Sequence, residues 1–229
     1  MNHQNESLTY SAIIGDIKDS RALSNRKEVQ EKFRSVLQSI NETYADDIAA
    51  EFVITLGDSF QGLVKNKQVI LTILFEIELA LSPVEFRFGI GLGEISTPIQ
   101  RENSLEMDGT AYHRARQMIE TIEENETKYT TSETNTMICS GTGYQPTDNL
   151  LNAVLSLGTA LKSKWTQRQK EIMYTYFSHG ENQYKTAAAL NIGQSSVNKA
   201  LNAAKYYTYK TALSEASLFL AQLDKEELV

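Results

Sequence analysis

The sequence predicts an α+β sheet domain followed by a smaller, all-helical domain. Over residues 1–147 short apolar runs with the period of strands alternate with helical repeats, whereas residues 148–229 show helical repeats alone. The charge divides in a similar way: residues 1–159 hold 13 Lys and Arg against 23 Asp and Glu, and the rest of the chain holds 9 against 6. Two parts of opposite charge balance are expected to have different partners.

The composition narrows the class of protein. It is 41% hydrophobic and 22% charged, as in an ordinary globular protein. No apolar run approaches the roughly 20 residues of a membrane span, and the N-terminus lacks the basic and apolar regions of a secretory signal. We therefore expect a cytoplasmic protein with no membrane partner. The single cysteine, Cys139, excludes an internal disulfide framework and a cysteine-rich zinc site.

The first half of the sheet domain places two carboxylates at strand ends. A buried strand is expected over residues 9–17, ending on Asp16, and a helix over residues 25–44 that starts with an Asn and Glu capping box. Residues 52–64 form an apolar run broken by a Gly-Asp pair, which indicates two strands joined by a tight turn. If these strands lie side by side, Asp16 and Asp58 converge.

The second half of this domain continues with helix, strand, helix and strand. An apolar helix is expected over 67–81, stopped by a Ser-Pro pair, and an alternating strand over 84–95. The glycines of that strand mark a place that a backbone or a ligand approaches closely. Further on we expect a helix from Asp108 that ends in an acidic, exposed region over 120–126, a strand over 136–140 and a linker over 141–147.

The second domain contains the pattern of a helix-turn-helix. Helices are expected over 149–163, 166–178, 183–190, 194–207 and 209–223. Within 183–205, small alanines allow a close helix crossing, Leu190 and Ile192 fill the core, and Gly193 makes the turn. A three-helix bundle used only for protein contact has the same pattern, so a protein-binding scaffold is a further hypothesis.

The exposed face of the second helix in that pattern carries groups that read base edges or hold phosphates. The candidate DNA-binding residues are Gln194, Ser195, Ser196, Asn198, Lys199, Asn202 and Lys205. The modest positive charge favours a homodimer, which would bring two such helices onto one DNA site. The last helix is a candidate dimerisation element, because its apolar residues Leu213, Ala216, Leu220 and Leu223 form one stripe.

Four segments of the first domain together resemble known families. They are Ile14-Gly-Asp-Ile-Lys-Asp-Ser-Arg21, Ile54-Thr-Leu-Gly-Asp-Ser-Phe60, Phe86-Arg-Phe-Gly-Ile-Gly-Leu-Gly-Glu-Ile95 and Asp108-Gly-Thr-Ala-Tyr-His-Arg-Ala-Arg116. In order and spacing they are similar to the catalytic domain of class III nucleotide cyclases, a ferredoxin-like βαββαβ fold, and more faintly to diguanylate cyclases. The whole chain resembles the SatD family of small bacterial proteins, although Ser59 stands where the SatD pattern usually has Glu.

The cyclase resemblance implies a metal and phosphate site. In those enzymes two aspartates bind Mg²⁺, which polarises the phosphates and activates the attacking hydroxyl. Asp16 and Asp58 match these metal ligands, for Mg²⁺ or Mn²⁺, and Arg116 matches the catalytic arginine that stabilises the transition state. The resemblance also implies a nucleotide or another phosphate-containing small molecule as ligand, held by Ile17, Lys18, Ser20, Arg21, Gly57 and Tyr112.

Departures from the cyclase pattern affect mainly base recognition. Ile54 stands where a Lys or Glu reads the purine, and Tyr112 where an asparagine positions the ribose; Ile54 cannot form a hydrogen bond. Asp19 replaces a glycine of the phosphate loop, and Arg116 could merely pair with Glu120. We therefore expect a nucleotide- or phosphate-sensing DNA-binding regulator with a degenerate cyclase-like domain. The alternative is an active metal-dependent nucleotidyl cyclase or nucleotidyltransferase.

Overall fold

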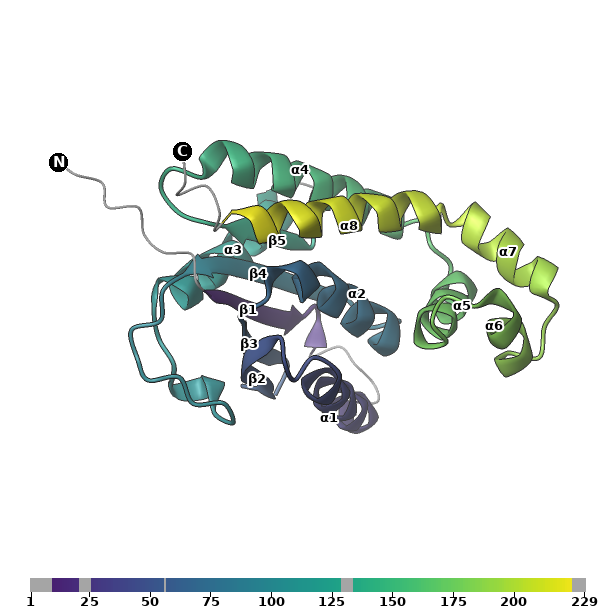
Figure 1. Ribbon diagram of the computed structural model, residues 1–229, viewed down its shortest axis with the longest axis horizontal. Helices are drawn as coiled ribbons and strands as arrows, with labels where there is room; N and C mark the ends of the chain where they lie inside the picture. The colour runs from purple at the N-terminus through teal and green to yellow at the C-terminus, as the bar shows by residue number, and fades with distance from the viewer. Residues whose placement is uncertain (1–9, 21–25, 56, 129–133, 224–229) are drawn as a thin grey trace.

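The computed structural model describes residues 10–20, 26–55, 57–128 and 134–223. Helices and strands alternate first and helices alone follow, as the sequence predicts (Figure 1). In chain order the elements are β1 (Tyr10–Ile17), α1 (Arg26–Thr43), β2 (Ile48–Ile54), β3 (Ser59–Val64), η2 (Lys67–Val69), α2 (Ile70–Leu81), β4 (Phe86–Gly93), η3 (Ser104–Glu106), α3 (Thr110–Lys128), β5 (Thr136–Cys139), α4 (Gln145–Lys162), α5 (Gln167–Ser178), α6 (Gln183–Ala189), α7 (Gln194–Ala203) and α8 (Tyr206–Gln222).

The five strands form one mixed sheet in the order β2-β3-β1-β4-β5. β1 is antiparallel to both of its neighbours, β2 is antiparallel to β3, and β5 is parallel to β4. Strands β1 to β4 with α1 and α2 make the expected ferredoxin-like βαββαβ unit, which α3 and β5 extend by one strand. The α+β fold class is therefore confirmed.

One face of the sheet is covered by α1 and α2 over an aromatic core. Phe60 of β3 lies at its centre and is fully buried, with its ring 5.6–6.4 Å from the rings of Phe33, Phe52, Phe86 and Phe88. Edge-to-face and tilted contacts of this kind stabilise aromatic pairs beyond the area that they bury. Alternation along β1 and β4 directs the other set of side chains to the opposite face.

The opposite face is covered by α3, which lies directly on β4. A Cβ atom added at Gly89 or Gly91 would collide with the main-chain carbonyl oxygen of Ala115 or Ala111, respectively. The glycines expected to admit a close neighbour therefore admit the backbone of a helix. This contact fixes the position of α3 on the sheet. It therefore also fixes where the C-terminal end of α3, which reaches the candidate site, lies.

Helices α4 and α8 run side by side and pack on the sheet domain (Figure 1). The linker expected over 141–147 is wrong from residue 145 on, because α4 begins at Gln145 with Pro146 in its first turn. Proline is well tolerated there, so the Gly-Tyr-Gln-Pro sequence starts a helix rather than a linker. Ser140 N–H also donates to the Asp148 carboxylate at 2.8 Å, which ties β5 to α4. The domain boundary at 147 stays a prediction.

The apolar stripe of α8 is buried within the chain itself. Ala216, Leu220 and Leu223 belong to the same core cluster as the α1 and α2 face of the sheet and are at most 7% exposed. They are therefore not available to pack against a second copy. Exposed apolar side chains on α4 and α8 are found instead at Leu150, Leu157, Leu218 and Phe219. The homodimer itself stays a prediction.

Helices α5, α6 and α7 form a second hydrophobic cluster together with the start of α8 and with Phe75 and Leu79 of α2. Its core includes Ile172 and Met173 of α5, Ala187 of α6, and Val197 and Leu201 of α7. Trp165 closes it from the α4–α5 connection, with its indole N–H donating to the Ala204 carbonyl oxygen at 2.8 Å. None of the helices in the described ranges is long and apolar enough to cross a membrane.

Replacing Gly89 by alanine should destabilise the fold by about 2–3 kcal/mol, because α3 has to move away from β4. Chemical denaturation followed by circular dichroism measures the effect. Gly193→Ala is the matched control, because an added Cβ there has its nearest neighbour at 3.6 Å; we expect a change within about 1 kcal/mol. Equal stability of the Gly89→Ala protein and the wild type would contradict the close contact.

Candidate functional site

The candidate site lies where β1 ends beside the turn between β2 and β3. In the antiparallel register Asp16 stands opposite Ser59 on β3 and Arg87 on β4. The Ile17 main-chain N–H donates to the carbonyl oxygen of Asp58 at 3.0 Å, which holds the turn against the end of β1. The register therefore brings Asp16 and Asp58 to the same end of the sheet.

The turn itself depends on glycine. Gly57 has φ +89°, a conformation that glycine adopts without steric cost. Gln30 of α1 donates a hydrogen bond from Nε2 to the Gly57 carbonyl oxygen at 3.1 Å. The neighbouring helix thus fixes the turn that presents Asp58.

Asp16 is held by two partners. Its Oδ1 accepts a hydrogen bond from the Ser59 hydroxyl at 3.0 Å, and its Oδ2 lies 2.9 Å from Nη1 of Arg87. Burial raises the pKa of the Asp16 carboxyl above its usual value, although the hydrogen bond from Ser59 and the charge of Arg87 act against it. The negative charge of Asp58 raises the Asp16 pKa further, because two neighbouring carboxylates repel each other when both are ionised.

Asp58 is held by the chain segment after β1. The hydroxyl of Ser20, which is 8% exposed, donates to Asp58 Oδ2 at 2.5 Å. Asp19, the residue before Ser20, has φ +50°, so the segment turns back toward the hairpin. The segment after β1 therefore contacts Asp58 through Ser20, and phosphate binding by Ile17, Lys18 and Ser20 stays a prediction. Arg21, the last residue of that expectation, lies outside the described residues.

Arg87 and Glu126 complete the cluster, and the sequence analysis missed both. Arg87 donates from Nε at 2.9 Å and from Nη2 at 2.6 Å to Oε2 of Glu126, at the end of α3. Lys18 lies 2.8 Å from Oε1 of the same carboxylate. Glu126 was expected in an exposed acidic region, but its side chain is only 15% exposed. Strand alternation places Arg87 on the α3 face together with the glycines, which is the signal that could have found it.

The pKa of Glu126 follows from these contacts. Burial alone would raise it, but hydrogen bonds and charges from Arg87 and Lys18 outweigh burial and hold the pKa below its usual value. The carboxylate therefore stays ionised between two cations. Asp16, Arg87, Glu126 and Lys18 form one chain of alternating charges, which we call the strand-end charge cluster.

The strand-end charge cluster is a poor match for the pair of Mg²⁺ ions that the cyclase resemblance implies. Arg87 places a positive charge 2.9 Å from Asp16 Oδ2, where it opposes a divalent cation, and Ser20 occupies one oxygen of Asp58. Within the described ranges no group of three or more His, Cys, Asp and Glu side chains could hold a metal ion. Mg²⁺ or Mn²⁺ binding by Asp16 and Asp58 stays a prediction.

Two other residues of the expected site lie elsewhere. Tyr112 is 1% exposed in the core between α3 and the sheet, and this burial raises its pKa; its hydroxyl has no hydrogen-bond partner among the described residues. Arg116 is exposed and lies near Asp108, whose pKa is lowered by hydrogen bonds from the Gly109 main chain and from His113 and further by the charge of Arg116. Arg116 and Glu126 are ten residues apart on α3, or about 15 Å along a helix, so Arg116 is not part of the strand-end charge cluster.

A cavity of about 250 Å³ opens beside Lys18. Its lining includes Lys162 and Lys170, as well as Trp165 and the carboxylates of Glu78 and Glu85. We call it the lysine cavity. It lies between the end of β1 and the start of α5, so it connects the strand-end charge cluster with the helical part of the chain. Lys18 and Lys162 are ion-paired with Glu126 and Glu78, whereas Lys170 has no ion pair among the described residues and is a charge that a phosphate group can bind.

The candidate DNA-binding residues lie on and just after α7. Ser195, Ser196, Asn198, Lys199, Asn202 and Lys205 are exposed, and Gln194 is half-buried. Gln183 of α6 accepts from Gln194 Nε2 at 2.5 Å and donates to Asn198 at 3.4 Å, so two of these side chains are held by a neighbouring helix.

The turn before α7 differs from the expectation in one detail. The residue with positive φ is Asn191, at +51°, whereas Gly193 has φ −74° and serves as the N-cap of α7. Asparagine is among the few residues that adopt the left-handed conformation readily. Leu190 and Ile192 pack against the helical cluster as expected.

The fold and the strand-end charge cluster define an α+β protein with a ferredoxin-like sheet whose central strand carries Asp16 near its end, beside Asp58 of the neighbouring turn. The chain belongs to the SatD family, whose model matches residues 10–218. No curated protein matches this chain at a significant level.

Three solved structures are similar to the chain. One bacterial light-regulated adenylyl cyclase has 15% sequence identity and a TM-score of 0.41, over 56% of this chain and 74% of that one. A second such cyclase has 14% identity and a TM-score of 0.36, over 58% of this chain and 45% of the other. The third is a regulator of polyketide synthase expression from Bifidobacterium adolescentis. It has 15% sequence identity and a TM-score of 0.28, over 94% of this chain and 81% of the other.

Replacing Glu126 by glutamine should destabilise the protein at pH 7 by about 1–3 kcal/mol, because Arg87 and Lys18 lose a shared, largely buried partner. The folded-state pKa of Glu126 is lowered, so its contribution is present above the usual carboxyl pKa and is lost as the pH falls through the folded value. The difference between variant and wild type should therefore shrink toward pH 3.

Urea unfolding between pH 3 and pH 7 measures this dependence. Glu124→Gln is the control, since Glu124 is exposed on the same helix, and we expect a change within about 0.5 kcal/mol. A Glu126→Gln effect that is the same at every pH would show that packing, rather than charge, explains it.

Proposed function

We propose that this SatD family member is a DNA-binding regulator that reads DNA with α7 and senses a phosphate-containing ligand at the sheet end of β1. The observation that carries the proposal is the arrangement of α6 and α7. Val197 and Leu201 are fully buried against the helical cluster while the polar side chains of α7 face solvent. A helix anchored on one side and polar on the other can enter the major groove.

The polar face of α7 is suited to DNA in its chemistry. Ser195 and Ser196 lie at its exposed first turn, where recognition helices contact base edges, and Lys199 follows one turn later. Gln183 holds Gln194 and Asn198 in position, which lowers the entropy cost of ordering them on a binding partner. These features support base contacts by α7, with Lys199 and Lys205 as phosphate contacts.

A homodimer is part of the proposal. The positive excess of the C-terminal part is small, so one α7 alone would bind DNA weakly. The surface available to a second copy includes exposed leucines on α4 and α8, Leu150, Leu157 and Leu218 among them. A two-fold dimer would give two α7 helices a fixed spacing along the DNA.

The ligand-sensing half of the proposal rests on the lysine cavity. Lys18 and Lys170 line it, and Lys170 has no ion pair among the described residues, so its charge can bind a phosphate group. Because α4 and α5 also line this cavity, a bound ligand would contact both the sheet domain and the helical cluster. A phosphate-containing ligand held there would bias the position of the DNA-reading helices.

An enzyme is the second candidate function. The convergence of Asp16 and Asp58 at one end of the sheet favours a metal-dependent nucleotidyl cyclase or nucleotidyltransferase. Arg116, exposed on α3, could then act in the site of a second protomer, as the cyclase resemblance implies. Arg87 beside Asp16 and the apolar Ile54 count against it, so regulation is the better supported function.

Lys199→Ala should weaken binding to duplex DNA and make the slope of log Kd against log salt smaller by about 1, because one phosphate contact is lost. Fluorescence anisotropy with genomic DNA fragments between 50 and 200 mM salt, taken as a roughly physiological range, measures both. Lys27→Ala on α1 is the control, since this exposed lysine lies in the sheet domain. DNA binding absent at low salt, or equally affected by both variants, would favour the protein-binding scaffold.

Lys170→Ala should weaken binding of ATP or pyrophosphate by about tenfold, as loss of one charged phosphate contact does. Isothermal titration calorimetry with and without Mg²⁺ measures this, and Lys164→Ala is the control, because Lys164 is exposed outside the cavity lining. Binding that needs Mg²⁺ and is lost in Asp58→Asn, with cyclic product or phosphate release, would instead support the enzyme. Absence of any binding would contradict the ligand-sensing half.

A further inference from the structure

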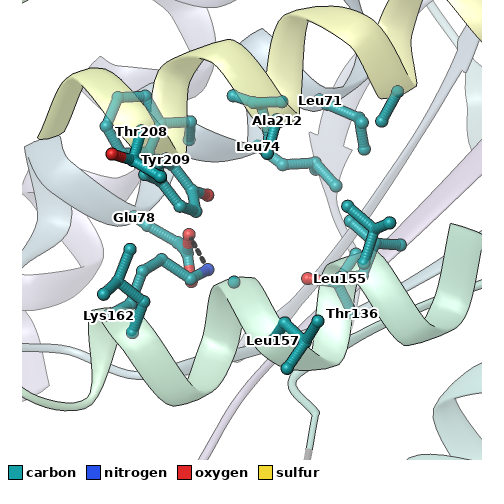
Figure 2. A pocket seen from close by; sticks show the side chains of 16 residues that line it. Leu71, Leu74, Glu78, Thr136, Leu155, Leu157, Lys162, Thr208, Tyr209 and Ala212 are labelled. Atoms are coloured by element: carbon teal, nitrogen blue, oxygen red, sulfur yellow. Dashed lines mark hydrogen bonds and ion pairs between the residues drawn. The ribbon is translucent and has the colours of Figure 1, made fainter. Parts of the chain in front are cut away.

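A second cavity, of about 260 Å³, lies between α2, α4 and α8 and adjoins the lysine cavity, with which it shares Phe75, Glu78 and Lys162 in its lining. Figure 2 shows α4 and α8 on two sides of it, with Leu71 and Leu74 of α2 and Leu155 of α4 directed inward. Leu161 and Leu213 add to the apolar lining. Most of the wall is therefore hydrocarbon, as in many small-molecule sites.

One end of this cavity is polar. Lys162 of α4 lies 2.7 and 2.5 Å from the two carboxylate oxygens of Glu78 on α2, the pair drawn with a dashed line in Figure 2. Asn135 donates to Glu78 Oε1 at 2.5 Å and accepts from Lys162 at 3.4 Å. Both charged side chains are less than one fifth exposed. The pair is thus a closed, neutral unit at the end of an apolar cavity.

The aromatic ring of Tyr209 on α8 also borders the polar end. It is 7% exposed, and Lys162 Nζ lies 6.0 Å from the ring centroid. The ring also packs on Phe75 and Trp165, with centroids 5.2 and 5.1 Å away. A ligand in the cavity would therefore contact an aromatic face and a polar end from one position.

We propose that this cavity binds a small, uncharged and mainly apolar molecule that carries one hydrogen-bond donor. A cavity of about 150 Å³ holds benzene, so 260 Å³ holds roughly ten non-hydrogen atoms. Glu78 Oε2 accepts from Lys162 alone among the described residues, so it has capacity for a hydroxyl or amide N–H.

A charged ligand is disfavoured for an electrostatic reason. An anion would have to compete with Glu78 for Lys162, and a cation would have to compete with Lys162 for Glu78. Either competition leaves a largely buried charge without its partner. The neutral pair therefore selects an uncharged ligand, and its remaining acceptor capacity orients the ligand's donor.

The test uses the full-length protein and four probes of suitable size: 1-octanol and 4-propylphenol as neutral donors, and octanoate and octylamine as charged analogues. We expect saturable binding of at least one neutral probe by calorimetry, with a Kd on the order of 0.1–1 mM for a ligand of this size. A bound probe that bridges three helices should also raise the unfolding temperature. The charged analogues should bind about tenfold more weakly.

Two variants at the cavity mouth test whether the probes bind in this cavity. Ala212 and Thr208 of α8 line the cavity and are exposed, so phenylalanine at either position should obstruct the cavity without disturbing the core. We expect each to weaken neutral-probe binding by about tenfold. Ala160→Phe is the matched control, because Ala160 is exposed on α4 outside the lining. Thermal unfolding confirms that each variant folds.

Four outcomes would overturn the proposal. Neither neutral probe binds saturably, or the mouth variants bind as the control does, or a charged analogue binds as tightly as the neutral probes. A dimer that Ala212→Phe disrupts and that the probes leave unchanged, seen by analytical ultracentrifugation, would assign this surface to a second copy of the chain and would likewise overturn it.

Discussion

The antiparallel register of β1 with its two neighbours is the constraint on which the candidate site depends. Because β1 lies at the centre of the sheet, its last residues are opposed on both sides, by Ser59 on β3 and by Arg87 on β4. A shift of one residue would turn Asp16 to the aromatic face. Ile13 and Ile17 of β1 oppose this shift, since it would turn them away from the buried phenylalanines around Phe60.

The close approach of α3 to the sheet determines the charge of that site. Glycines on β4 let the helix backbone lie directly on the strand, and the last turns of α3 then bring Glu126 onto Arg87. A cluster of two carboxylates thus becomes a chain of alternating charges. This explains why the site resembles a metal centre in sequence but forms an ion-pair network in structure. Lys18, at one end of this network, also lines the lysine cavity.

Helix α8 joins the two parts of the chain. It starts in the helical cluster at Tyr206 and Tyr209 and ends in the core of the sheet domain at Leu220. Movement of α7 is therefore not independent of the sheet, because α7 leads directly into α8. Helix α4 lines both cavities, and each cavity is also lined by residues of the helical cluster. A ligand bound in either cavity could therefore affect that cluster.

The sequence by itself determined the order of the elements, the Gly-Asp turn that presents Asp58 and the buried face of α7, because local periodicity and turn chemistry encode these features. The ferredoxin-like unit was implied by the resemblance to class III nucleotide cyclases, and the convergence of Asp16 and Asp58 depended on their strands being neighbours. Only the tertiary structure decided the partners. Arg87 and Glu126 are 39 residues apart and meet through packing, Tyr112 is buried by α3, and the stripe of α8 is covered by this chain's own core. Periodicity shows that a face will be buried; the three-dimensional packing alone decides what buries it.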